Sequence, residues 1–160
     1  MTRTFRTPTL ASLLAAGLAA GSLTAVPAMA GTCPAGKVTT DGQKPGAKAH
    51  KDVKEELLGQ IDLAKEKVAV PDHHFRMRRL TVAPGGEVAW HSHAERPALI
   101  YVVSGAITEY SSHCQVPIEH ETGDLSVEQG GLSHWWKNNS KKPTVLISAD
   151  IAQDPNEHGM

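Results

Sequence analysis

The sequence has few of the residues that nucleic-acid and membrane binding require. Aromatic residues make up 4% of the 160 positions, and 16 basic side chains are balanced by 17 acidic ones. No basic stripe or ladder of aromatic residues runs along the chain, so nothing favours a nucleic-acid partner. After residue 26, no apolar run is long enough to span a membrane. We therefore expect a single globular domain of modest size.

The first 30 residues have the pattern of a secretory signal peptide. Arg3 and Arg6 precede an apolar stretch at residues 10–26, and an Ala-Met-Ala sequence ends at Ala30. We expect cleavage between Ala30 and Gly31, and a periplasmic or secreted protein without membrane attachment. An uncleaved membrane anchor is the alternative, which is disfavoured because the stretch is short and rich in Ala and Gly.

Cysteine occurs only twice, as Cys33 and Cys114. In an exported chain, a lone pair is more typical of a disulfide than of reactive thiols. The bond would close a long loop and tie the N-terminal region to the domain. In the competing interpretation, Cys114 is a metal ligand.

The chain outside the signal peptide divides into three parts. Residues 31–50 are rich in Gly, Pro, Lys and Thr without apolar periodicity, so we expect an extended arm. Residues 51–151 are the expected domain, and residues 152–160 form a polar tail. Val53 and Leu57, four residues apart, allow one short helix within residues 47–58, whereas residues 60–64 favour a strand.

Short strand-like segments alternate with turns from residue 74 onward. The predicted strands cover residues 74–83, 87–93, 98–103, 106–111, 125–128, 133–138 and 143–151, with turns at 84–86 and 104–105 and a loop at 112–121. Strands at intervals of about 8–12 residues, separated by glycine turns, predict an all-β sandwich or barrel.

Three histidines are placed as metal ligands. His91 and His93 point to the same face of a strand-like segment, and His134 follows a double glycine in a second segment. We expect one divalent transition metal, with Zn, Cu, Fe, Ni and Mn all open, and a nitrogen-only site favours copper and zinc. The alternative is that these are ordinary histidines inside a barrel without metal.

The two histidine segments resemble the two motifs of the cupin superfamily. The matching residues are Gly85, His91, His93 and Gly105 in the first motif, and Gly123, Gly131, His134 and Asn138 in the second. The resemblance covers residues 76–151 and implies a single-domain jelly-roll β-barrel with the metal inside. More narrowly, the chain is similar to small exported cupins labelled quercetin-dioxygenase-like, which implies a small-molecule substrate or ligand and a homodimer.

The chain departs from the first motif at its glutamate. The motif spacing reaches Ala98 or Pro97 instead, and Gln129 stands at the proline of the second motif. We expect Ala98 to point inward beside the metal and to leave a coordination position open. Glu95 is the candidate replacement, either as a displaced ligand or general base or as a solvated turn residue.

Other side chains near the expected site have two interpretations each. Trp136 shares the inward face with His134 and either stacks on a substrate or fills the core. Arg76 and Arg78 share one strand face and are either an anion-binding pair or solvated arginines. The histidines on predicted turns and loops are expected at the surface: His73, His74, His113 and His120.

Two functions follow from this pattern. The first is a metal-dependent enzyme acting on a small molecule: a dioxygenase if the ion is redox active, and otherwise a hydrolase or isomerase. The second is a non-catalytic module that binds or senses a small ligand or the metal itself. The identity of the bound metal discriminates best between them.

Overall fold

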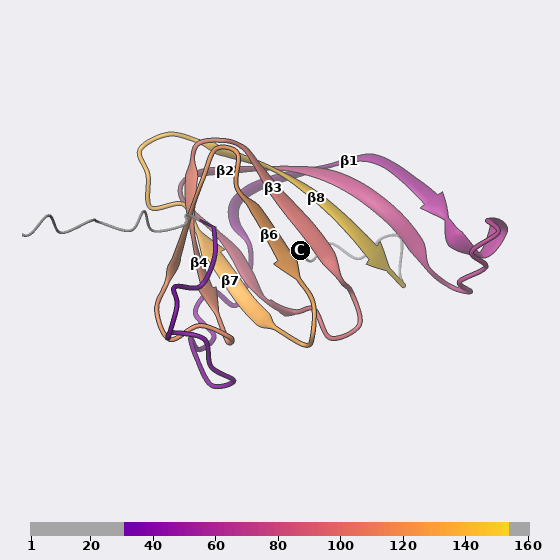
Figure 1. Ribbon diagram of the computed structural model, residues 1–160. Coiled ribbons are helices and arrows are strands. Elements are labelled where there is room, and N and C mark those ends of the chain that lie inside the picture. The colour runs from indigo at the N-terminus through magenta and orange to yellow at the C-terminus, as the bar shows by residue number, and fades with distance from the viewer. Residues whose placement is uncertain (1–30, 154–160) are drawn as a thin grey trace, which may run out of the picture.

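The computed structural model describes residues 31–153, which form a nearly closed barrel of antiparallel strands (Figure 1). The elements are β1 (Lys51–Asp62), the 3-10 helix η1 (Leu63–Lys65), β2 (His74–Ser92), β3 (Ala98–Ser104), β4 (Ala106–Ser111), β5 (Ile118–Glu121), β6 (Leu125–Glu128), β7 (Ser133–Lys137) and β8 (Thr144–Ala152). The all-β prediction is confirmed. The predicted signal peptide, with Ala30, and the end of the predicted tail lie outside the described residues. Within residues 31–153, no helix has the length and apolar character needed to cross a membrane.

The strand β2 belongs to both layers of the barrel. Its first half pairs with β1 and β8, and its second half pairs with β7. The turn expected at residues 84–86 is a bend inside this one strand. Gly85 adopts a φ of 74°, which a residue without a side chain tolerates, and its N–H donates to the Asn138 carbonyl. The chain therefore changes layer without breaking its strand.

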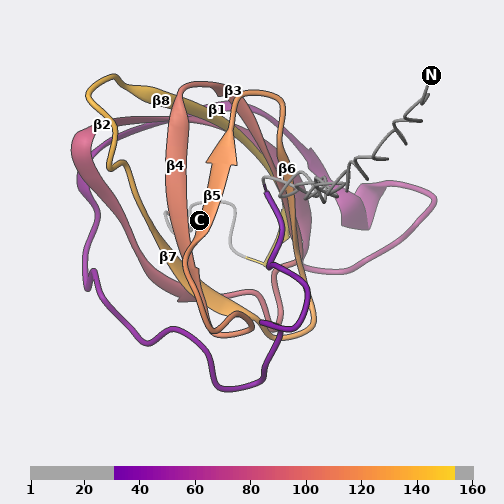
Figure 2. The same cartoon turned by 60° about the vertical axis from the view of Figure 1, so that its left-hand side comes forward.

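The strands follow the order β5-β4-β7-β2-β8-β3-β6, and β1 adds to β2. One layer contains β1, the first half of β2, β8, β3 and β6, and the other contains the second half of β2, β7, β4 and β5. Because β5 and β6 end this order, the barrel has a seam between them. The start of the N-terminal arm runs along this seam (Figure 2), where the Gly31 N–H donates to the Glu119 carbonyl on β5.

The interior of the barrel differs between its two ends. The apolar end is filled by Leu80, Val82, Val88, Ile100, Val102, Ile107 and Leu146, each at most 1% exposed. The other end is polar and buries charged side chains, among them Arg76, Arg78, Glu128, His134 and Asp150. Arg76 and Arg78 both form ion pairs with Asp150. These arginines are therefore neither solvated nor open to an anion, which corrects both interpretations of them.

Two local predictions differ from the structure. Residues 51–58 lie in the strand β1 and not in a helix, because a spacing of four also places Val53 and Leu57 on one face of a strand. The expected short helix is only the three-residue η1, after β1. The loop expected at residues 112–121 ends in the strand β5, which pairs with β4.

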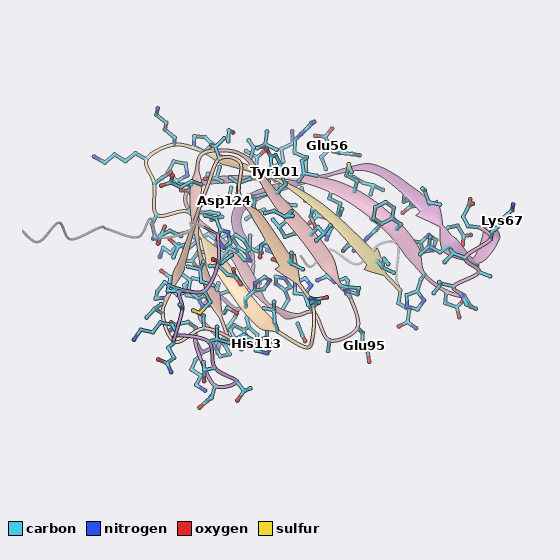
Figure 3. All side chains as sticks on the ribbon, in the orientation of Figure 1. Glu56, Lys67, Glu95, Tyr101, His113 and Asp124 are labelled. Carbon is cyan, nitrogen blue, oxygen red and sulfur yellow. A yellow bond between two sulfur atoms is a disulfide. The ribbon has the colours of Figure 1, made fainter. Side chains whose placement is uncertain are left out.

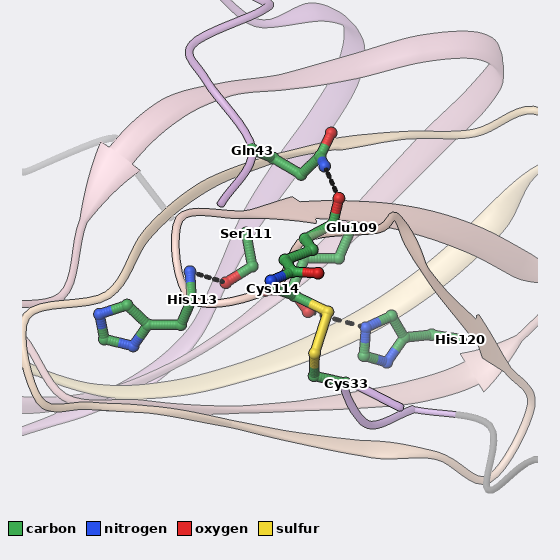
Figure 4. The surroundings of a disulfide bond; sticks show 8 residues. Cys33, Gln43, Glu109, Ser111, His113, Cys114 and His120 are labelled. Carbon is green, nitrogen blue, oxygen red and sulfur yellow. Dashed lines mark hydrogen bonds and ion pairs between the residues drawn. A yellow bond between two sulfur atoms is a disulfide. The ribbon is translucent and has the colours of Figure 1, made fainter. Parts of the chain in front are cut away.

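The N-terminal arm is attached to the outer face of the layer that contains β7. The predicted disulfide between Cys33 and Cys114 is present, with the two Cα atoms 5.7 Å apart (Figure 4). Farther along the arm, the Trp90 N–H donates to the Ala47 carbonyl. Gly46 lies so close to the Trp135 ring that a Cβ there would be 2.3 Å from it. Glycine is therefore required where the arm crosses this tryptophan.

The outer face of the opposite layer is apolar and is covered by no other part of residues 31–153. Its exposed apolar side chains come from four neighbouring strands, and Tyr101 among them points away from the barrel (Figure 3). They are Phe75 and Met77 on β2, Leu99, Tyr101 and Val103 on β3, and Leu125 and Val127 on β6, with Ile147 and Ile151 partly exposed on β8 between them. We call this surface the apolar sheet face.

Candidate metal centre

Three histidines converge at the polar end of the barrel. His91 on β2 and His134 on β7 are direct partners in the sheet, and His93 follows the end of β2. Their Nε2 atoms are 2.9 Å (His91 to His93), 3.1 Å (His93 to His134) and 3.1 Å (His134 to His91) apart. The three side chains predicted from the sequence are therefore brought together around one point.

Each of these rings is oriented by a hydrogen bond at its other nitrogen. The Nδ1–H of His91 donates to the Ala89 carbonyl at 2.8 Å, and that of His93 donates to the Arg96 carbonyl at 2.7 Å. His134 donates from Nδ1 to the Glu109 carboxylate at 2.8 Å. When all three rings are neutral, each carries its single proton on Nδ1, so the three Nε2 lone pairs face one another. This is the tautomer that metal ligation through Nε2 needs.

Glu128 supplies a carboxylate to the same cluster. Its Oε2 lies 2.9 Å from the His93 Nε2, and its Oε1 lies 3.5 Å from the His134 Nε2. The side chain is fully buried, and neither oxygen has a hydrogen-bond donor among the described residues. Buried carboxylates are normally paired, and the groups that face this one are the imidazoles of His93 and His134, which pair with it as cations only when they are protonated. One ligand atom from each of His91, His93, Glu128 and His134 falls within 4.8 Å of the others, which fits a metal ion.

The protonation of the cluster agrees with a cation site. Burial, together with the neighbouring His134, lowers the pKa of His91 far below its ordinary value, so its ring is neutral. Burial alone would also lower the pKa of His134, but the Glu128 and Glu109 carboxylates raise it. Without a metal, the carboxylates therefore favour a proton on His134. A divalent ion would displace that proton and satisfy the same negative charge.

Glu128 lies opposite Ala98, the position at which the first motif would place its glutamate. Ala98 on β3 and Glu128 on β6 are direct partners across the ladder, and both side chains are buried. The predicted inward position of Ala98 is therefore correct, but the position beside it is filled from the neighbouring strand. The nitrogen-only donor set expected from the sequence becomes three nitrogens and one carboxylate.

Glu95 does not take part in this cluster. It lies in the loop between β2 and β3, is exposed, and projects away from the barrel (Figure 3). The expectation that Glu95 is a displaced ligand or general base is corrected, because Glu128 reaches the three histidines from inside the barrel and Glu95 does not.

Trp136 and His120 form the wall behind His134. Trp136 is fully buried, with its ring centroid 5.5 Å from that of His134 and 4.5 Å from that of His120. Trp136 therefore fills the core behind His134, with its Nε1 3.2 Å from the His134 Nδ1. His120, expected at the surface, is fully buried and donates from Nε2 to Glu109 at 2.9 Å. Burial alone would raise the pKa of Glu109, but the hydrogen bonds from His120 and His134 lower it to about 2.

Comparison with known proteins identifies the fold. Residues 78–150 match the family model of the cupin domain. These residues form a cupin domain. The predicted resemblance to the cupin superfamily is thereby confirmed, and a comparison of the sequence with curated proteins gives no match.

One solved structure supports this fold, and two others are similar to the chain with lower TM-scores. A predicted oxalate decarboxylase from Thermotoga maritima aligns with a TM-score of 0.52 and 16% identity, over 71% of this chain and 96% of that one. A cupin 2 conserved barrel protein from Salinispora arenicola aligns with a TM-score of 0.48 and 16% identity, over 66% and 80% of the two chains. KdgF from a Halomonas species aligns with a TM-score of 0.48 and 14% identity, over 66% and 82%. At 16% identity, the similarity to the Thermotoga maritima structure concerns the fold alone.

Proposed function

We propose that this cupin is a metal-dependent enzyme that acts on a small molecule outside the cytoplasm. The observation that carries the proposal is the Glu128 carboxylate, which is fully buried beside three facing imidazole lone pairs and has no donor among residues 31–153. Such an arrangement is destabilising by several kcal/mol unless a cation compensates it. His91, His93, Glu128 and His134 are the ligands.

The four side chains suit a divalent transition metal. Imidazoles accept zinc, copper, iron and nickel, and the carboxylate extends the range toward manganese. When bound, the ion would supply Lewis-acid chemistry or, if redox active, dioxygen chemistry. His91 is the one ligand that is partly exposed, so a small molecule would reach the centre from its side. Trp136 and His120 close the opposite side to water.

Export is proposed together with this function. The disulfide between Cys33 and Cys114 is consistent with an oxidising compartment. We propose that residues 1–30 are removed as a signal peptide, that residues 31–50 are the arm, and that residues 51–151 are the cupin domain followed by a polar tail. Gly31 would then be the first residue of the mature protein.

Metal analysis of the protein purified from its native compartment tests the function. We expect close to one transition metal ion per chain, and a large loss of metal in His93→Ala and Glu128→Gln. Glu95→Ala is the matched control, because it removes a carboxylate from the nearby loop without touching the cluster. Unchanged metal content in both ligand variants would overturn the proposal.

Turnover separates the enzyme from a binding module. Protein loaded with iron or copper would be tested for oxygen consumption with a flavonol, a thiol and a diketone, and protein loaded with zinc or manganese would be tested for hydrolysis or isomerisation. Tight metal binding without turnover in either set would favour the non-catalytic alternative.

We further propose that the apolar sheet face joins two copies of this chain. The strand register places Met77, Ala149, Leu99 and Val127 in one row across four strands, and Ile147, Tyr101 and Leu125 in the next. Strands lie about 4.8 Å apart and residues of one face about 6.7 Å apart, so four strands and four rows project on the order of 500 Å². The accessible area is larger than this flat projection, because the side chains protrude from the sheet. A standard interface buries about 800 Å² per partner.

A second copy fits this face better than a charged partner. The only charge in these rows, Arg79, lies at their edge and is paired with Glu56. A two-fold axis would place identical apolar rows against each other. Light scattering should give the dimer mass for the wild type and the monomer mass for Tyr101→Asp, with exposed Val38→Asp on the arm as control. A monomeric wild type, or a dimer unaffected by Tyr101→Asp, would contradict the assignment.

A further inference from the structure

Behind His134 lies a carboxylate that the metal centre does not use as a ligand. Glu109 on β4 is 3% exposed and is paired in the sheets with Trp136 on β7 and Ile118 on β5. Its Oε1 accepts from the His134 Nδ1 at 2.8 Å, and its Oε2 accepts from the His120 Nε2 at 2.9 Å (Figure 4 shows the pair with His120). Both oxygens accept N–H bonds, so neither carries a proton.

The three histidine ligands are not held in the same way. His91 and His93 donate to neutral backbone carbonyls, whereas His134 donates to an ionised carboxylate. Charge-assisted hydrogen bonds are roughly twice as strong as neutral ones. A negative charge at Nδ1 also increases the electron density available at Nε2. His134 is therefore the strongest donor of the three and has its tautomer most firmly fixed.

His120 fixes the carboxylate in turn. It occupies the second Glu109 oxygen, and its ring lies 4.5 Å from that of Trp136. The Nδ1 of His120 is buried and has no hydrogen-bond partner among the described residues. Among residues 31–153, its ring therefore has one polar contact, the bond to Glu109, which keeps the carboxylate from rotating away from His134.

The balance of charges also indicates that Glu109 supports metal binding. Glu128 contributes one negative charge to the cluster, and Glu109 contributes a second directly behind it. Together, the two carboxylates match a divalent ion. Removing either leaves a net charge in a buried site, which is unfavourable.

We propose that Glu109 and His120 are positioning residues that set the tautomer and donor strength of His134 for metal binding. This inference rests on the proposed function. In Glu109→Gln, one orientation of the amide places its NH₂ against the His134 Nδ1, which then requires the tautomer with its proton on Nε2. The opposite orientation keeps the His134 proton on Nδ1 but places the NH₂ against the His120 Nε2. In both orientations the negative charge of the Glu109 carboxylate is lost. Substitutions of this kind weaken metal binding by about 10- to 100-fold.

Zinc affinity, measured by competition with a chelator, tests the inference. We expect Glu109→Gln to weaken zinc binding about 10- to 100-fold and His120→Phe to weaken it less. The matched control is Glu119→Gln, an exposed glutamate on β5 whose side chain accepts from the Thr108 hydroxyl and does not contact the cluster. Wild-type protein that binds no zinc would overturn the proposed metal site, and with it the proposed function. Wild-type binding with unchanged affinity in Glu109→Gln would overturn only the inference.

The imidazole ¹⁵N chemical shifts give a readout that loss of stability would not imitate. In the metal-free wild type near pH 8, we expect the His134 Nδ1 to carry the proton, and in Glu109→Gln we expect that signal to shift toward the other tautomer or a mixture. Thermal unfolding confirms that each variant is folded. A folded Glu109→Gln protein with unchanged His134 shifts would also overturn the inference.

Discussion

The facing positions of Ala98 and Glu128 allow the carboxylate of the proposed metal centre to be moved from one strand to the next. The two residues are direct partners across the antiparallel ladder of β3 and β6. Such partners have Cβ atoms about 4.5–5.5 Å apart on the same face. A glutamate side chain has three rotatable bonds, and it can therefore compensate for a shift of this size. The informative pair of proteins is Glu128→Ala and the same variant with Ala98→Glu added.

The structure sets the size of the expected effect. Glu128 is fully buried, and removing one partner of a buried ion pair costs about 3–5 kcal/mol. At about 1.4 kcal/mol per factor of ten, Glu128→Ala should weaken metal binding by roughly 100- to 3,000-fold. The space vacated by the carboxylate lies beside Ala98, so a glutamate there would not overfill the core. We expect Ala98→Glu to restore at least about a factor of ten, since one charge-assisted bond contributes about 1.5–3 kcal/mol.

Competitive chelator titration with zinc and manganese measures both the loss of affinity in Glu128→Ala and its recovery in the double variant. Circular dichroism checks that each variant is folded. Ala98→Glu alone is the control, because it places two carboxylates together and should reduce stability. Zinc affinity unchanged in Glu128→Ala would show that Glu128 is not a ligand. A folded double variant that binds no more tightly than Glu128→Ala would show that position 98 does not face the ion.

Three further outcomes are expected. Replacing both Cys33 and Cys114 by Ser should lower the free energy of unfolding by up to about 4 kcal/mol, because the disulfide restricts a long loop in the unfolded chain. Equal urea midpoints for the oxidised wild type and this variant would show that the disulfide does not stabilise the fold. Burial would raise the pKa of Asp150, but Arg76 and Arg78 lower it, so its contribution to stability is present above about pH 4 and is lost as the pH falls further. Asp150→Asn should therefore be destabilised at neutral pH, and a difference from wild type that stays constant down to pH 2 would refute this. The intact mass of the exported protein should correspond to a start at Gly31, and a full-length mass in the soluble fraction would exclude cleavage.

The three clustered histidines could be predicted because their spacing alone places them. His91 and His93 share a strand face, and the glycine-bounded segment of His134 completes the pattern. Glu128 could not be placed in this way, because Leu125 and Val127 suggest the buried face of its strand. In the structure those two side chains are exposed, while Ser126 and Glu128 point inward.

The strand β2 likewise exposes apolar side chains and buries polar ones. Phe75 and Met77 are exposed, and Arg76 and Arg78 are buried against Asp150. Hydrophobic periodicity assumes that apolar residues face the interior, whereas this barrel has a polar interior at one end and an apolar outer face. The clue available in the sequence was the alternation itself, which places polar residues at every second position on both strands. His120 was missed for another reason, since its strand β5 is only four residues long.

The attachment of the arm bears on the order in which the molecule folds. Cys33 and Cys114 are separated by 81 positions, and the N–H groups of Gly42 and Gln43 bind carbonyls just after β4 or at its end. These contacts cannot form until β4 and its following turn are in place. Contacts of such long range also carry a large loop-closure entropy, so the arm should dock after the barrel has assembled. During refolding, both thiols should therefore stay open to alkylation until the strands have paired. The rate at which they become protected then measures the rate at which the arm docks.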